Sequence, residues 1–277
     1  MDDLKLIFEK LESSKEVHFP YAQLEKADFK GLSFKNANLE GVILRGANLD
    51  EANFEGANLK NADLRQSILN NTSFKNADLS GALMQICEGE NINFEGATLE
   101  NADLTDAKTK SSNFKNANLS EANLQCLSAD NSNFENACLA SANLRAGSFT
   151  YCNLNGINKS KETQNNSLVS KLFSSFSKKN KTKRVKASHV DFEHSSLKDA
   201  NLENADLSYC NFCNTKMENA KLDGANLFEA KFIDAFLDGA TFAKSQLKNT
   251  VFTRASMKDT KLAGAKIDNT DFRGVLK

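Results

Sequence analysis

The sequence predicts an all-β solenoid, a rod of stacked coils, and two periods lead to this expectation. A period of five keeps a small and a large apolar residue in fixed places, as in Ala52 and Phe54. Such units cannot bury an apolar face alone and must stack on their own copies. A period of twenty, which groups four fives into one coil, places phenylalanine at Phe34, Phe54, Phe74, Phe94, Phe114 and Phe134, and later at Phe192, Phe212, Phe232, Phe252 and Phe272.

The first twenty residues precede the repeats. Leu4, Ile7, Phe8 and Leu11 fall on one face of a helix, so residues 1–20 are predicted to hold a short capping helix and a lead-in that cover the open edge of the first coil. A helix that binds a partner is the alternative. The single proline, Pro20, lies in this lead-in, where it interrupts no stacked strand.

Two runs of repeats follow, separated by an insertion. Residues 21–155 are predicted to form the first β-helix segment, residues 156–188 the basic insert, and residues 189–277 the second segment. Leu154 and Phe192 are 38 residues apart, which is 18 more than one coil. Together the runs make about eleven coils and, at about 4.8 Å per coil, a rod about 50 Å long.

Charge on the outer surface follows the same period. The residue after each phenylalanine of the first run alternates in sign, and the neighbouring side stacks Glu88 over Lys108. Opposite charges on adjacent strands stabilise their register, and columns that cancel cannot imitate a phosphate backbone on these two sides. The alternating column consists of Lys35, Glu55, Lys75, Glu95, Lys115 and Glu135.

The repeated Ala-Asn-Leu and Ala-Asp-Leu units, such as those at residues 57–59, 62–64 and 117–119, resemble the pentapeptide-repeat family. The resemblance covers about four fifths of the chain. It implies a right-handed quadrilateral β-helix in which each five-residue unit forms one side. Members of this family include DNA-shaped proteins that protect type II topoisomerases, scaffolds and regulatory binding partners. The resemblance implies no catalytic activity.

We expect no enzyme and no cofactor. Cys210 falls at a small inward position and Cys213 on the surface, so the pair cannot hold one metal ion. His18, His189 and His194 have no ligand or nucleophile spacing, and no glycine-rich phosphate loop is present. Catalytic, cofactor-binding and metal-binding residues are therefore expected to be none.

The core is thinner where Gly89, Thr109 and Ala129 occupy the large inward position in three successive coils. Repacking is one explanation, because Cys87 and Leu127 at the small position are larger than alanine. A groove for a ligand or a peptide is the other.

The basic insert is predicted to be the partner-binding arm. Nine lysines and arginines stand against Glu162 between residues 159 and 186, while the whole chain carries a net charge of −1. On a helical wheel its apolar residues share one face, so it also predicts a short amphipathic helix. The candidate binding residues are Leu168, Lys171, Leu172, Phe173, Phe176, Lys178, Lys179, Lys181, Lys183 and Arg184.

Several partners suit such an arm. A protein partner is favoured over an anionic membrane surface, and direct binding of nucleic acid is less favoured. A solvated loop, or a loop folded back onto the rod, is the alternative without a partner. The last coil, with Leu262, Ile267 and Phe272, is a candidate homodimer surface.

These observations favour a non-enzymatic scaffold or regulatory binding protein. A DNA-mimicking protector or inhibitor of DNA gyrase is the first alternative, and a scaffold attached to a membrane surface is the second. The first residues lack the features of a secretory signal, and no later stretch is apolar enough to span a bilayer, so the expected location is the cytoplasm.

Overall fold

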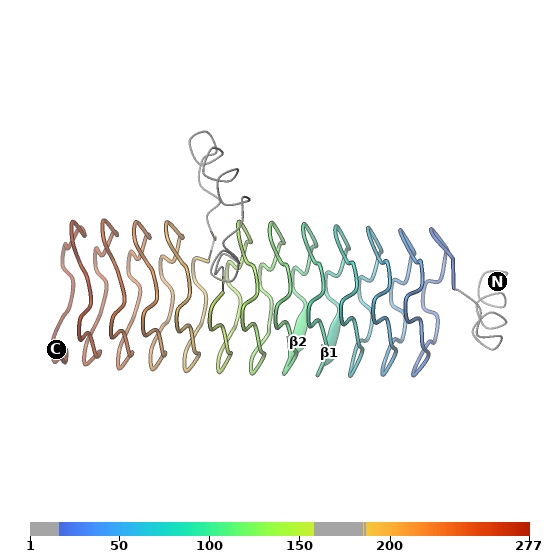
Figure 1. Ribbon diagram of the computed structural model, residues 1–277, viewed down its shortest axis with the longest axis horizontal. Helices are drawn as coiled ribbons and strands as arrows, with labels where there is room; N and C mark the ends of the chain where they lie inside the picture. The colour runs from blue at the N-terminus through green and yellow to red at the C-terminus, as the bar shows by residue number, and fades with distance from the viewer. Residues whose placement is uncertain (1–16, 158–184, 186) are drawn as a thin grey trace, which may run out of the picture.

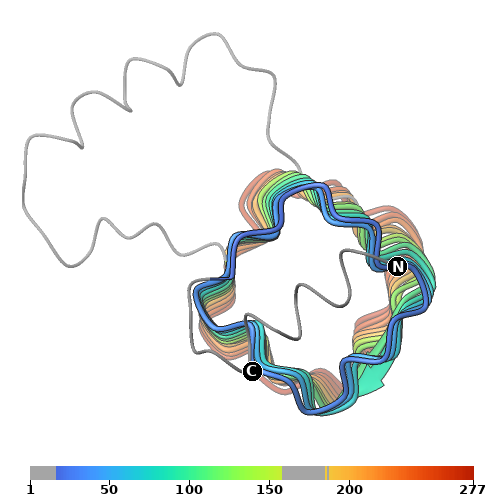
Figure 2. The same cartoon turned by 90° about the vertical axis from the view of Figure 1, so that its right-hand side faces the viewer.

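The computed structural model describes residues 17–157, 185 and 187–277. The described residues form a rod of stacked coils (Figure 1), and the view along the rod shows a four-sided outline (Figure 2). The predicted solenoid and its four sides are therefore confirmed. The predicted capping helix lies outside the described residues, and the count of about eleven coils stays a prediction.

One coil is described here by four sides, which in residues 37–56 are 37–41 (first), 42–46 (second), 47–51 (third) and 52–56 (fourth). In each side the first and third residues point inward; Ala52 and Phe54 are both fully buried. The fifth residue makes the corner and has a left-handed backbone, with φ of 68° at Gly56. Glycine and asparagine tolerate this conformation best, which explains why they recur there.

Parallel backbone pairing joins each coil to the next. Bridges along the rod connect residues twenty apart, such as Asn38 with Asn58. The chain turns every five residues, so most sides carry only a single bridge. In the described part of the chain two longer strands form, β1 (Glu88–Glu90) and β2 (Lys108–Lys110), which pair in parallel with Glu88 opposite Lys108.

The two runs of phenylalanine lie on different sides of the rod. The rings from Phe34 to Phe134 stack on the fourth side at centroid separations of 4.5 to 5.3 Å. The rings from Phe192 to Phe272 stack on the third side, where Phe192 lies on Phe149 at 5.7 Å. The predicted surplus of 18 residues between Leu154 and Phe192 is therefore wrong, because these two residues lie on different sides.

Pairing across the insertion gives its length. Asn153 pairs with Ser196, 43 residues later rather than 20, so the insertion adds 23 residues to one coil and not 18. Both ends of the predicted basic insert belong to the coil, since Ile157 and Ala187 are buried in the core. The first β-helix segment likewise begins before residue 21, because Val17 is already part of the core.

The thinner part of the core is closed. Gly89, Thr109 and Ala129 are buried, and an added Cβ at Gly89 would lie 2.6 Å from the backbone carbon of Leu69. The adjacent coils approach so closely here that a side chain is excluded at Gly89. This packing agrees with repacking of the core and leaves no opening at these three positions.

Candidate binding surfaces

The structure tests few of the predicted binding residues. Leu168, Lys171, Leu172, Phe173, Phe176, Lys178, Lys179, Lys181, Lys183 and Arg184 all lie outside the described residues. At the last coil, Leu262 and Phe272 are partly buried against the core, whereas the Ile267 side chain is 53% exposed. Both the arm and the homodimer surface therefore stay predictions.

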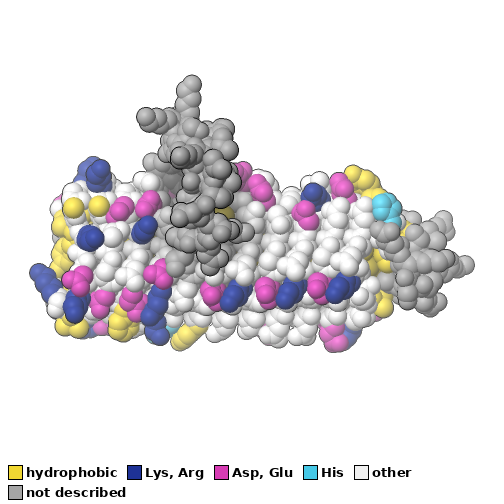
Figure 3. Space-filling view, in the orientation of Figure 1, with side chains coloured by type: hydrophobic (Ala, Val, Ile, Leu, Met, Phe, Trp, Pro, Cys, Tyr) yellow, Lys and Arg dark blue, Asp and Glu magenta, His cyan; other side chains and the backbone are white. Residues whose placement is uncertain are grey.

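The alternating column on the fourth side forms ion pairs. Nζ of Lys115 lies 2.9 Å from a carboxylate oxygen of Glu135. The predicted charge ladder is confirmed, and Figure 3 shows it as a row in which blue and magenta side chains alternate along the rod. Two further pairs of the ladder, Lys35 with Glu55 and Lys75 with Glu95, are separated by 3.2 and 3.5 Å.

Ion pairs also occur on the other three sides. The first side has Lys60 with Asp78 at 3.3 Å, and the third side has Lys108 with Glu88 at 3.2 Å. On the second side, Asp63 pairs with two arginines. All four sides thus neutralise part of their own charge, including the two that the sequence left open.

Exposed aromatic rings occupy corners near the insertion, and the sequence reasoning missed them. His189 stacks on Tyr209 at the corner of the second and third sides, with centroids 4.5 Å apart. His194 stacks on Tyr151 at the corner of the third and fourth sides, at 4.9 Å. The signal in the sequence is a histidine or a tyrosine at the corner position of the five-residue unit, where asparagine and glycine are usual. Exposed stacked rings of this kind are common at protein interfaces.

The cysteines form no redox or metal site in the described part of the chain. All six are free, and no group of three or more metal-ligating side chains occurs among the residues described. Cys210 is buried and Cys213 is half-buried, in agreement with their predicted divergence. Burial raises the pKa of Cys87 and of Cys152 to about 12, so these thiols stay protonated and inert.

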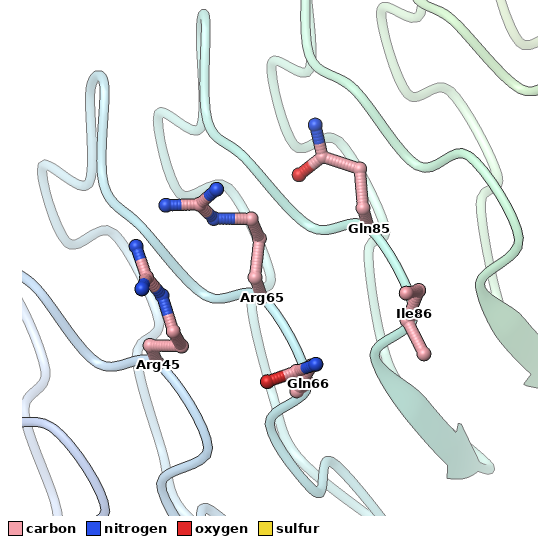
Figure 4. Close-up of a pocket in the computed structure, with 5 residues that line it drawn as sticks. All are labelled: Arg45, Arg65, Gln66, Gln85 and Ile86. Carbon is pink, nitrogen blue, oxygen red and sulfur yellow. The ribbon is translucent and has the colours of Figure 1, made fainter.

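A pocket of about 350 Å³ opens at the corner between the second and third sides (Figure 4). Figure 4 shows its arginine and glutamine side chains coming from successive coils. The sequence reasoning missed this site; the available signal was a second arginine twenty residues after the first, which stacks like charges on adjacent coils, unlike the alternating column of the fourth side. We call it the arginine pocket, and it is lined by Arg45, Arg65, Gln66, Gln85 and Ile86.

Asp63 holds the two guanidinium groups of the arginine pocket in place. Arg65 donates from Nε and Nη2 to the two carboxylate oxygens at 2.8 and 2.5 Å, and Arg45 donates from Nη2 at 2.9 Å. These hydrogen bonds, above all those of Arg65, lower the pKa of Asp63 to about 2 against the opposing effect of burial. Asp63 is therefore ionised at any physiological pH.

The glutamine on the next coil lengthens this polar row. Gln85 donates from Nε2 to Asp103 at 2.8 Å, while its Oε1 is buried and has no hydrogen-bond partner among the described residues. The side chains of this row offer hydrogen-bond donors and acceptors, and none of them is a nucleophile beside a base.

No membrane-crossing helix is found in the described part of the chain.

A four-sided coil of five-residue units, with a continuous apolar core and a polar exterior, defines a repeat solenoid. Family models confirm the class: "Pentapeptide repeat region" matches residues 15–94 and 47–124. "Pentapeptide repeats (8 copies)" matches residues 112–150, 188–224, 205–242 and 235–274. The chain belongs to the pentapeptide repeat family. No curated protein sequence matches it.

Solved structures with similarity to the chain include other pentapeptide repeat proteins. One is HetL, involved in heterocyst differentiation regulation, from the cyanobacterium Nostoc sp. strain PCC 7120, with 21% identity over 97% of this chain and 94% of that chain and a TM-score of 0.34. Another is Rfr23 from the cyanobacterium Cyanothece 51142, with 26% identity over 47% of this chain and 90% of that chain and a TM-score of 0.30.

A third is QnrB1, a plasmid-mediated fluoroquinolone resistance protein, with 16% identity over 71% of this chain and 84% of that chain and a TM-score of 0.30. Because all three TM-scores are low, these similarities carry no argument about partners.

Proposed function

We propose that this chain is a non-enzymatic scaffold or regulatory binding protein, in which the rod is a stiff support and the basic insert is the partner-binding arm. The support for this proposal is the contrast in charge. All four sides of the rod pair cations with carboxylates, whereas nine cationic residues between 159 and 186 face one acidic residue in the sequence. Residues 159–186 alone carry a net charge of +8 in a chain whose total is −1, and so concentrated a cationic segment favours recognition of an acidic partner.

Affinity capture from native cell extract tests this function. The full-length protein is compared with a variant in which Lys178, Lys179, Lys181, Lys183 and Arg184 are all changed to Gln, which removes charge without changing length. We expect a protein partner to be captured by the first and lost from the second. Equal capture by both forms would assign recognition to the rod instead.

The gyrase alternative requires long rows of uncompensated acid, as in a DNA backbone. The ion pairs on all four sides count against such rows. A supercoiling assay with purified DNA gyrase and a near-stoichiometric amount of this protein decides the point, since an unchanged supercoiling rate would remove the alternative.

The second alternative, a scaffold attached to a membrane surface, predicts co-sedimentation with anionic vesicles that weakens as salt is added. A homodimer through Leu262, Ile267 and Phe272 predicts a sedimentation coefficient above that of the monomer at micromolar concentration.

We also propose a cytoplasmic location. The six cysteines are free and Cys126 is exposed, which agrees with a reducing compartment, where free thiols persist.

A further inference from the structure

The arginine pocket has a cationic wall that is already ordered. Arg65 is held by two hydrogen bonds and Arg45 by one, all to the same carboxylate. A ligand that meets these guanidinium groups need not fix two long flexible side chains, so its binding loses less conformational entropy. The geometry of this wall therefore suits an anion.

The charge balance of the pocket points the same way. At the wall formed by Arg45 and Arg65 two cations face one anion, and the Asp63 side chain is only 9% exposed, whereas those of the two arginines are 44% and 36% exposed. The next carboxylate of the row, Asp103, accepts a hydrogen bond from Gln85 on the following coil. A guanidinium has five N–H donors, and most of them are not used by Asp63. An approaching carboxylate would meet donors and net positive charge, with the repelling carboxylate of Asp63 beneath them.

The other wall of the pocket, formed by Gln66 and Ile86, favours a peptide over a simple anion. The Ile86 side chain is 57% exposed at the pocket, and Gln66 is exposed on the same corner, one coil earlier (Figure 4). The amide of Gln66 can both donate to and accept from a peptide backbone, and Ile86 can cover the methylene groups of an acidic side chain. A volume of about 350 Å³ is at the small end of ligand sites and suits one side chain rather than a large molecule.

We propose that the arginine pocket binds an acidic segment of a partner protein, with one Asp or Glu carboxylate on Arg45 and Arg65 and the adjoining backbone on Gln66. This site lies on the rod, away from the basic insert in the sequence, and it rests on the proposed function only in requiring a protein ligand. It adds a second contact, which would fix the orientation of a partner along the rod.

Titration of the full-length protein with two short capped peptides tests the site. The probes are acetyl-Gly-Ala-Glu-Ala-Gly-amide and its matched control with Gln in place of Glu. The signals to follow are the Nε–Hε resonances of Arg45 and Arg65 in 15N-edited NMR spectra, which detect weak binding directly. We expect saturable shifts with the Glu peptide and much smaller shifts with the Gln peptide. Equal shifts with both peptides would overturn the proposal.

Matched variants locate the binding. Arg45→Gln should weaken binding of the Glu peptide about tenfold, since a charge-assisted hydrogen bond is lost. Arg145→Gln is the control, because Arg145 stands in the same column of the second side next to Asn143 rather than an aspartate. Equal affinity in these two variants would contradict the assignment.

Substitutions at the rim avoid any loss of folding. Gln66 is exposed and takes no part in the core, so Gln66→Glu should weaken binding of the Glu peptide and Gln66→Lys should strengthen it. The absence of opposite effects would count against the site. Inorganic phosphate serves as the competing anion; displacement of the peptide at equal concentration would show a general anion site and overturn the peptide assignment. The affinity-capture test of the basic insert is independent of all these outcomes.

Discussion

Phe149 and Phe192 stand on opposite sides of the insertion in the sequence, yet their rings stack with centroids 5.7 Å apart. Phe149 also contacts Phe134, at 5.5 Å and a tilt of 60°. Aromatic packing thus passes from the fourth side to the third within one coil, and it remains continuous where the chain is interrupted. The two segments share one core.

Loss of a central ring should destabilise this core strongly. Phe114 is fully buried between Phe94 at 4.7 Å and Phe134 at 4.5 Å. Phe114→Ala should lower the free energy of unfolding by about 3 to 5 kcal/mol, because it removes buried area and leaves a cavity. Urea denaturation followed by circular dichroism measures the change. The matched variant Phe272→Ala, at a partly buried ring of the last coil, should cost clearly less; equal costs would contradict the packing.

The length of the insertion gives a second prediction. Deletion of residues 159–181 removes 23 residues, keeps the five-residue register and places Thr182 at the inward third position of the joined side, so the variant should fold and melt within a few degrees of the parent. Deletion of residues 159–180 leaves one surplus residue and should melt lower. Thermal unfolding of both variants provides the comparison, and a lower melting temperature for the 23-residue deletion would show that the register is misassigned.

The charge ladder should respond to reversal of one member. Lys75 lies 3.5 Å from Glu95 and follows Glu55 in the same column. Lys75→Glu would place three acids in a row and should lower the free energy of unfolding by about 1 kcal/mol at low salt. Lys75→Gln should cost less. Urea denaturation at low and high salt is the measurement, and a cost that does not fall with added salt would exclude an electrostatic origin.

Acid should lower the free energy of unfolding through protonation of Asp63 on the second side. Its pKa of about 2 lies below the value near 4 of an unfolded aspartate. Its contribution, at most about 2 kcal/mol, is therefore complete above about pH 4 and is lost as the pH falls toward 2. The stability difference between the parent and Asp63→Asn should shrink over that range. A difference that stays constant from pH 5 to pH 2 would show that the carboxylate charge is not its source.

Thiol reactivity should follow burial. Cys126 is exposed, whereas Cys87, Cys152 and Cys210 are buried, and burial raises the pKa of all three. A chromogenic disulfide reagent should label Cys126 fastest and the half-buried Cys138 and Cys213 more slowly, and Cys126→Ser should remove the fastest phase. The three buried thiols should react only after denaturant is added. Labelling of more than two thiols in the folded Cys126→Ser variant would indicate a looser core.

The sequence predicts the inward pattern well because each five-residue unit repeats the same local requirement. Ala52 and Phe54 are buried as expected. The ion pair of Lys115 with Glu135 is also expected, because the twenty-residue period places the two side chains on adjacent coils. The sequence does not predict which side of the rod each unit occupies after the insertion. Phenylalanine and leucine both occur at the large inward position on several sides, so the residue type does not identify the side. Counting in steps of twenty identifies it, but the insertion interrupts that count.

The candidate sites were harder to predict than the core. Stacking of His189 on Tyr209 depends on pairing between adjacent coils in the second segment, whose register begins after the insertion. The arginine pocket depends on the geometry of side chains, since Arg45 and Arg65 share a carboxylate that lies between them only after folding. Neither arrangement has a sequence motif of its own.

Anchoring of both ends of the insertion has a consequence for how this rod can diversify. The carbonyl oxygen of Ile157 accepts from Asn201 at 3.0 Å, and that of Val185 accepts from Asp206 at 2.9 Å, so the chain leaves and rejoins the coil at bonded positions. The insertion thus falls within the first side of its coil, between two positions that stay bonded to the next coil. We expect this side to serve as a graft point, at which a foreign peptide, an epitope or a small folded domain is tolerated without redesign of the rod.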